Sequence, residues 1–131
     1  MNRVIIADDD RVSSHLLCAV LRRSGYMPEP VFDVDALFAA AARAPVPTAI
    51  LLDLNMPGGS GADSIRGIRN APGLAEVPLI VVSGSSDPAA SAECLRLGAT
   101  AYLSKPVEPA MLLGVVQRAI DPERNGGVAQ G

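Results

Sequence analysis

The chain has 131 residues, a length that suits one domain with a sizeable buried core. Hydrophobic residues make up 49% of it and charged residues 19%, a balance that excludes disorder as the main state. The formal net charge is −3 and the sequence has no cluster of Lys and Arg, so neither nucleic acid nor an anionic membrane surface is expected as a direct partner. No apolar run reaches about 18 residues, which excludes a membrane-spanning helix.

The N-terminus and the cysteines indicate a cytoplasmic protein. The first three residues lead directly into a strand-like run that reaches an acid at Asp8, which is not the pattern of a signal peptide. Cys18 and Cys94 lie in separate helix-like segments without CxxC spacing. We therefore expect two reduced, packed thiols.

Five short runs predict β-strands. Most are apolar at every position and bounded by turn signals, as is typical of strands buried on both faces of a parallel sheet. Pro28 and Pro30 interrupt the second run, and because proline cannot donate to a ladder, this strand is placed at a sheet edge. The predicted strands span residues 4–7, 27–32, 49–52, 78–82 and 101–104, and the third ends in the carboxylate of Asp53.

Helical spacing of apolar residues separates these strands. In the first helix, over 12–23, apolar residues recur at this spacing, with Asp10 as the N-cap and Gly25 as the terminator; they are Val12, Leu16, Ala19, Val20 and Leu21. The second helix begins at a cap, Asp33 or Asp35, and is expected to face the core with Leu37, Phe38, Ala41 and Ala42. Further helices are predicted over 60–71, 88–97 and 108–120.

Strands that alternate with helices predict an α/β fold with a parallel sheet covered on both faces. With the proline-bearing second strand outermost, the natural strand order is 2-1-3-4-5. This is a flavodoxin-like (βα)5 doubly wound sheet, which binds ligands at the carboxyl ends of its strands.

We expect five side chains from separate parts of the sequence to meet at that edge. Asp8 and Asp9 follow the first strand and Asp53 ends the third, while Ser83 and Lys105 follow the fourth and fifth. Three neighbouring carboxylates repel one another unless a cation is present, and hard oxygen ligands suit Mg²⁺. A lysine and a hydroxyl suit phosphate oxygens. We therefore predict that Asp53 is a carboxylate nucleophile that becomes phosphorylated, with metal and lysine neutralising the phosphoryl group.

Four motifs in this order and spacing resemble the receiver domain of bacterial response regulators, the CheY-like domain of two-component systems. They are VIIADDD, ILLDLNMP, IVVSG and the pair Lys105-Pro106. The resemblance covers about residues 3–120. It implies a receiver domain over 1–120, followed by a flexible tail or linker over 121–131.

The resemblance assigns a role to each residue at the acidic edge. Asp53 is implied to be the phosphoacceptor, and Asp8, Asp9 and Asp53 to hold Mg²⁺ together with the backbone carbonyl of Asn55. Mn²⁺ can substitute for Mg²⁺ in such a site.

Further residues are implied to surround the phosphoryl group. Ser83 and Lys105 would bind it, Gly84 would offer a backbone N–H, and Asn55 would flank it. The peptide bond between Lys105 and Pro106 is expected to be cis.

The resemblance also implies a signalling role rather than that of an enzyme, apart from self-catalysed phosphoryl transfer and autodephosphorylation. A sensor histidine kinase or a histidine phosphotransfer protein would phosphorylate Asp53. Ser83 would then move toward the phosphoryl group and Tyr102 would follow, which changes the surface formed by the fourth helix, fifth strand and fifth helix. The output would be altered binding of a downstream protein. The sequence leaves open whether phosphorylation also produces a homodimer.

Three alternatives are weighed against this interpretation. A small HAD-like phosphatase would use the DxD spacing of Asp8 and Asp10, but Asn55 cannot supply the acid two residues after Asp53. A flavin- or nucleotide-binding module would need a glycine loop after the first strand, where the chain has three acids. A receiver fold that binds partners without phosphorylation is the third.

Overall fold

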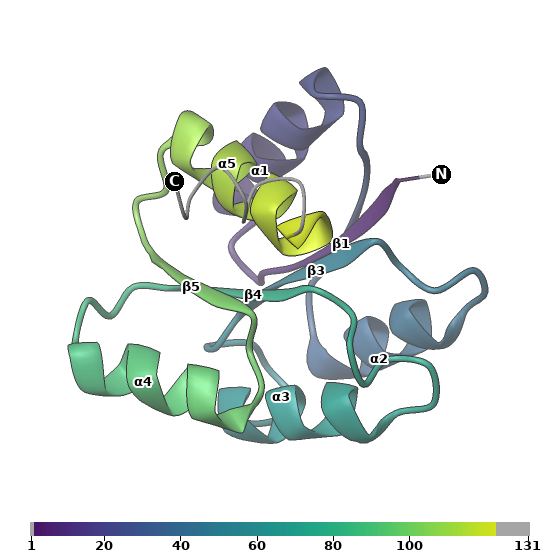
Figure 1. The fold of residues 1–131 in the computed structure, drawn as a ribbon, viewed down its shortest axis with the longest axis vertical. Coiled ribbons are helices and arrows are strands. Elements are labelled where there is room, and N and C mark those ends of the chain that lie inside the picture. Colours follow the sequence, from purple (N-terminus) through teal and green to yellow (C-terminus); the bar gives the residue numbers. More distant parts are fainter. Residues whose placement is uncertain (1, 123–131) are drawn as a thin grey trace.

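The structure is a computed structural model and describes residues 2–122. Within them, five parallel strands form one sheet in the order β2-β1-β3-β4-β5 and alternate with five helices (Figure 1). The predicted flavodoxin-like fold and its strand order are confirmed. The elements are β1 (Arg3–Ala7), α1 (Arg11–Arg23), β2 (Met27–Val31), α2 (Val34–Ala42), β3 (Ala49–Asp53), α3 (Gly61–Asn70), β4 (Leu79–Ser83), α4 (Pro88–Leu97), β5 (Ala101–Ser104) and α5 (Pro109–Ile120).

Helices cover both faces of the sheet, α1 and α5 on one and α2, α3 and α4 on the other (Figure 1). Successive side chains of a strand point to opposite faces, so β3 supplies both hydrophobic cores. Ile50 and Leu52 belong to the core under α2, α3 and α4, and Ala49 and Leu51 to the core under α1 and α5. Every residue of β3 and β4 is buried, whereas the proline-bearing β2 lies at the predicted edge.

The buried face of α1 differs in part from the predicted one. Leu21 is buried, but Val12 and Leu16 are 70% and 60% exposed, and Leu17 and Cys18 pack against the sheet instead. Apolar residues occur on two sides of this helix, so helical spacing by itself did not select the buried side. The Asp10 cap is confirmed, since its carboxylate accepts the N–H groups of residues 12 and 13.

The second helix requires a smaller correction. Asp33 is its N-cap, with Oδ1 accepting the Ala36 N–H at 2.7 Å. Leu37 and Ala41 are buried as predicted, and Phe38 is half-buried. The prediction that Ala42 faces the core is wrong: Ala40 is buried in its place, because the helix ends at Ala42, where that side chain extends past the sheet into solvent.

The remaining predictions concern the termini, the cysteines and the membrane. The predicted tail over 121–131 lies, apart from its first two residues, outside the described residues. Cys18 and Cys94 are free and buried, and burial raises the pKa of both thiols. Among the described residues, none of the helices has the length and apolar composition to cross a membrane.

Arg69, near the end of α3, joins the loops at the amino-terminal edge of β4 and β5. Its guanidinium donates to the carbonyls of Gly98, Leu74 and Val77 at 2.8, 3.1 and 2.7 Å, and to Thr100 Oγ1 at 3.3 Å. Hydrogen bonds from a charged donor are stronger than neutral ones, and partly buried carbonyls are costly to leave unpaired. Arg69 therefore fixes the end of α4 relative to α3.

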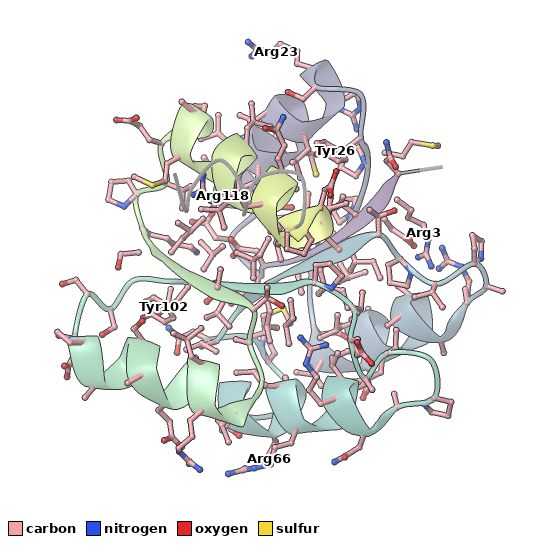
Figure 2. All side chains as sticks on the ribbon, in the orientation of Figure 1. Arg3, Arg23, Tyr26, Arg66, Tyr102 and Arg118 are labelled. Atoms are coloured by element: carbon pink, nitrogen blue, oxygen red, sulfur yellow. The ribbon has the colours of Figure 1, made fainter. Side chains whose placement is uncertain are left out.

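Replacement of Arg69 should destabilise the fold far more than replacement of its neighbour Arg66. We expect Arg69→Met to lower the free energy of unfolding by about 2–4 kcal/mol, because three carbonyls lose their donor. Arg66, which Figure 2 shows pointing away from the sheet, forms an ion pair with exposed Asp63, so Arg66→Met should cost about 0.5 kcal/mol or less. Urea unfolding measures both, and equal losses would contradict this role for Arg69.

Candidate functional site

The carboxyl ends of four strands meet at one edge of the sheet and bring the predicted site residues together. The strand register pairs Ala7 with Leu52 and Asp53 with Val82, so the ends of β1, β3 and β4 are level. Asp8 follows β1 directly, and Asp53 and Ser83 are the last residues of β3 and β4. All three of these polar side chains are buried, with exposures of 2%, 7% and 3%.

Lys105, which follows β5, connects two of these groups. Its Nζ donates to Asp8 Oδ2 and to Asp53 Oδ2, each at 3.1 Å. Burial by itself would lower the pKa of this ammonium group, but the hydrogen bonds and charges of Asp53 and Asp8 outweigh it and the pKa of Lys105 is raised. The peptide bond between Lys105 and Pro106 is cis, as expected.

Backbone N–H groups hold the second oxygen of each buried carboxylate. Asp8 Oδ1 accepts the Asp10 N–H at 2.9 Å, and Asp53 Oδ1 accepts the Asn55 N–H at 3.0 Å. Each side chain thus has one oxygen on the backbone and one on the ammonium group of Lys105. This fixes both carboxylates with their oxygens turned toward the shared edge.

Asp9 completes a cluster of three carboxylates that fits a hard cation. One oxygen from each of Asp8, Asp9 and Asp53 lies within 4.8 Å of the others. Opposite ligands of an octahedral Mg²⁺ ion are about 4.2 Å apart, so small rotations suffice for shared coordination. Asp9 is exposed, which leaves room for the waters that Mg²⁺ retains. The donor set therefore suits Mg²⁺; the expected ligand role of the Asn55 carbonyl stays a prediction.

The loop between β4 and α4 is tied to β5 through one carbonyl. The carbonyl of Ser85 accepts the Tyr102 hydroxyl at 2.7 Å and the Ser104 hydroxyl at 3.2 Å. Figure 2 shows Tyr102 on the side of β5 that faces α4. The Ser85 N–H donates to Ser83 Oγ at 3.2 Å, and Ser85 Oγ accepts the N–H of Asp87, the N-cap of α4. Ser85 thus connects Ser83 to α4 and β5.

The sequence did not reveal the part that Ser104 plays. The sequence predicts Ser104 only as the last residue of a strand. The available signal was the pair Tyr102 and Ser104, which alternation along β5 places on one side of that strand. Gly84 is exposed, and no atom lies within 4 Å of the place that a Cβ would occupy. Its expected role as an N–H donor stays a prediction.

These features define a doubly wound α/β domain with an acidic, lysine-bearing edge. Residues 4–117 match the response regulator receiver domain family, and the chain belongs to this family. The fold resembles the chemotaxis response regulator CheY4 of Vibrio cholerae, with a TM-score of 0.84, 28% identity and coverage of 91% of this chain and 98% of the other. A putative response regulator from Chloroflexus aurantiacus gives a TM-score of 0.86 at 26% identity, covering 91% and 97%.

Curated relatives are longer than this chain. The phosphate regulon transcriptional regulatory protein PhoB of Escherichia coli is 28% identical over 123 residues, which cover 92% of this chain and 53% of PhoB. The sensory/regulatory protein RpfC of Xanthomonas campestris is 33% identical over 113 residues, 85% of this chain and 15% of RpfC. The chain thus spans about half of PhoB and a small part of RpfC.

Removal of the Lys105 charge should destabilise the domain in the absence of divalent metal. We expect Lys105→Gln to lower the free energy of unfolding at pH 7 by about 2 kcal/mol, because two buried carboxylates lose their cation. Asp53→Asn in the same background should recover part of this loss. Urea unfolding of the single and double variants measures the coupling, and strictly additive changes would show that the two side chains do not interact.

The contribution of Lys105 to the stability of the fold depends on pH with a definite sign. Because the pKa of Lys105 is raised above its ordinary value of 10.5, its stabilising contribution is complete below that value and is lost as the pH rises through the folded-state pKa.

Proposed function

We propose that this chain is a phosphoacceptor module of a two-component phosphorelay, in which a phosphohistidine donates its phosphoryl group to Asp53. The observation that carries this proposal is the Lys105 ammonium group, held 3.1 Å from both Asp8 and Asp53. A carboxylate oxygen of Asp53 attacks phosphorus, the bond from phosphorus to the donor imidazole nitrogen breaks, and the imidazole leaves with the electron pair. Self-catalysed phosphoryl transfer and autodephosphorylation are the only reactions assigned to the domain.

The acidic residues have separate tasks in this proposal. Asp8, Asp9 and Asp53, with the Asn55 carbonyl, would hold Mg²⁺ or Mn²⁺, which supplies positive charge to the transferring phosphoryl oxygens. Burial and the N–H of Asn55 orient Asp53 toward the edge of the sheet.

The groups on the other side of Asp53 would receive the phosphoryl oxygens. Lys105 provides a mobile point charge, Ser83 a hydroxyl donor and Gly84 a backbone N–H. Lys105 already contacts the carboxylate that reacts, so it needs little rearrangement to contact the product.

Phosphorylation is tested by intact mass after incubation with Mg²⁺ and acetyl phosphate. We expect a hydroxylamine-labile mass gain that disappears in Asp53→Asn and in the absence of divalent metal. Asp10→Asn is a matched control, because Asp10 caps α1 and its amide can still accept those N–H groups. A gain that persists in Asp53→Asn would place the acceptor elsewhere, and no gain in the unaltered protein would favour a receiver that binds partners without phosphorylation.

Ser85 provides the route by which phosphorylation would change the surface formed by α4, β5 and α5. When Ser83 Oγ turns to the phosphoryl group, it gives up the Ser85 N–H that it accepts in this structure. The carbonyl of Ser85 is held by Tyr102, and its hydroxyl by the N-cap of α4, so both elements respond to this residue. The result would be a population shift between two arrangements of the loop and Tyr102.

Ser104 and Tyr102 should share the task of holding this loop. We expect Tyr102→Phe and Ser104→Ala each to accelerate hydrogen exchange at the Ser85 and Asp87 amides modestly. The double variant should exchange faster than the two single effects predict, because the Ser85 carbonyl then has neither donor. Tyr26→Phe, at a distant tyrosine, should change nothing at these amides. A full effect from Tyr102→Phe with none from Ser104→Ala would remove Ser104 from this role.

The proposal includes partners and a setting. A sensor histidine kinase or histidine phosphotransfer protein would donate the phosphoryl group, and a downstream protein would receive the signal, with a phosphorylation-dependent homodimer as one form of output. The receiver would span residues 1–120 with a linker over 121–131, in the cytoplasm. PhoB and RpfC, named as regulatory proteins, are consistent with such a pathway.

A HAD-like phosphatase is not favoured by the geometry. Its second acid would be Asp10, but the Asp10 carboxylate is exposed and accepts two N–H groups at the start of α1. It is therefore oriented to the helix rather than toward Asp8 and Asp53. Turnover of a generic phosphate ester measures this alternative directly.

A further inference from the structure

A hollow of about 420 Å³ lies between α1 and the end of edge strand β2. We call it the basic groove and define it by six of its lining residues, Arg11, His15, Cys18, Arg22, Pro30 and Phe32. The four residues from α1 are spaced i, i+4, i+7 and i+11, so they share one side of the helix. This side belongs to the helix itself, whereas Asp8 and Asp9 of the acidic edge precede its N-cap, Asp10.

The cations of the basic groove have no carboxylate partner. Within residues 2–122, neither Arg11 nor Arg22 forms an ion pair. Four other arginines form ion pairs: Arg3 and Arg43 with Glu29, and Arg66 and Arg96 with acids on their own helices. In a chain with a net charge of −3, two guanidinium groups without a carboxylate partner beside one hollow make that hollow locally positive.

Both arginines line the groove. Arg11 lies over the Phe32 ring, 3.7 Å from its centroid, and stacking on the ring leaves its in-plane N–H donors available. A ligand would therefore meet one cation, Arg11, that its ring contact already orders, which lowers the entropy cost of binding.

The spacing of the cations selects the kind of ligand. Arg11 and Arg22 are separated by about 16 Å along the helix axis, at 1.5 Å per residue, a spacing that suits two separate anionic groups better than a single one. A continuous polyanion such as nucleic acid would also extend over Asp9 and Asp10 at the end of the stripe and be repelled there. Separate carboxylates on a protein can be placed at the cations alone, while apolar side chains contact Pro30 and Phe32.

We propose that the basic groove is a docking surface for an acidic, amphipathic segment of a partner protein. Arg11 and Arg22 receive its carboxylates, His15 hydrogen-bonds between them, and Pro30 and Phe32 contact its apolar side. This surface acts in the unphosphorylated protein, so its test is separate from that of Asp53 phosphorylation.

The test is a titration of the ¹⁵N-labelled chain, without phosphodonor or divalent metal, with an alanine-rich helical peptide. Its glutamates are spaced i, i+4, i+7 and i+11, and a glutamine version of the peptide is the control. We expect salt-sensitive shifts at the amides of α1 and Phe32 with the glutamate peptide alone. In Arg11→Ser/Arg22→Ser, affinity should fall about tenfold, as for the loss of two exposed charge pairs.

Matched variants separate this surface from general electrostatics and from unfolding. Arg23→Ser/Arg118→Ser removes the same charge from residues that do not line the groove and should leave affinity within about twofold. Arg11→Lys/Arg22→Lys keeps the charge and should retain most of the binding. Equal binding of the glutamine peptide, an equal loss in the Arg23/Arg118 variant, or stronger shifts of the same amides by duplex DNA would each overturn the proposal. So would concentration-dependent shifts of these amides in the free protein, because a second copy would then occupy the groove.

Discussion

The structure of the functional edge depends on one ammonium group that satisfies two buried carboxylates. Asp8 and Asp53 are 2% and 7% exposed, and charges so deeply buried are costly unless they are paired and hydrogen-bonded. Lys105, the only lysine in the chain, contacts both at 3.1 Å. Lysine suits this position because its flexible stem lets the charge follow an oxygen that moves, whereas the planar guanidinium group of arginine is suited to a fixed partner.

Arginine side chains make the contacts that have to stay fixed, and the lysine makes those that have to change. Arg69 contacts three carbonyls and a hydroxyl at the opposite edge of the sheet, and Arg3 joins Glu29 to the carbonyls at the end of α2. These contacts hold the amino-terminal edge rigid. At the carboxyl edge, within residues 2–122, the Ser85 carbonyl accepts its hydrogen bonds from two hydroxyls, which exchange partners at low cost. The edge beside Asp53 is therefore the part of the sheet that can rearrange at low cost.

The sides of α1 show how one helix can carry separate surfaces. Leu17, Cys18 and Leu21 pack on the sheet, whereas Val12 and Leu16 are exposed on a second side and the cations of the basic groove lie on a third. No cluster of basic residues is visible in the linear sequence, because Arg11, His15 and Arg22 are separated by several residues. The helix brings them to one side, where they line the same hollow.

The sequence by itself determined the strands, the order 2-1-3-4-5 and the set of residues at the acidic edge. Buried parallel strands are almost wholly apolar, so a carboxylate, hydroxyl or lysine at a strand end marks the edge where ligands bind. Tertiary structure decided which side of α1 is buried and that Ala40 rather than Ala42 faces the core, since these depend on the rotation and length of each helix against the sheet. It also decided that Ser104 and Tyr102 share one carbonyl, because that contact joins strand β5 to the loop after β4, whose separation no local pattern specifies.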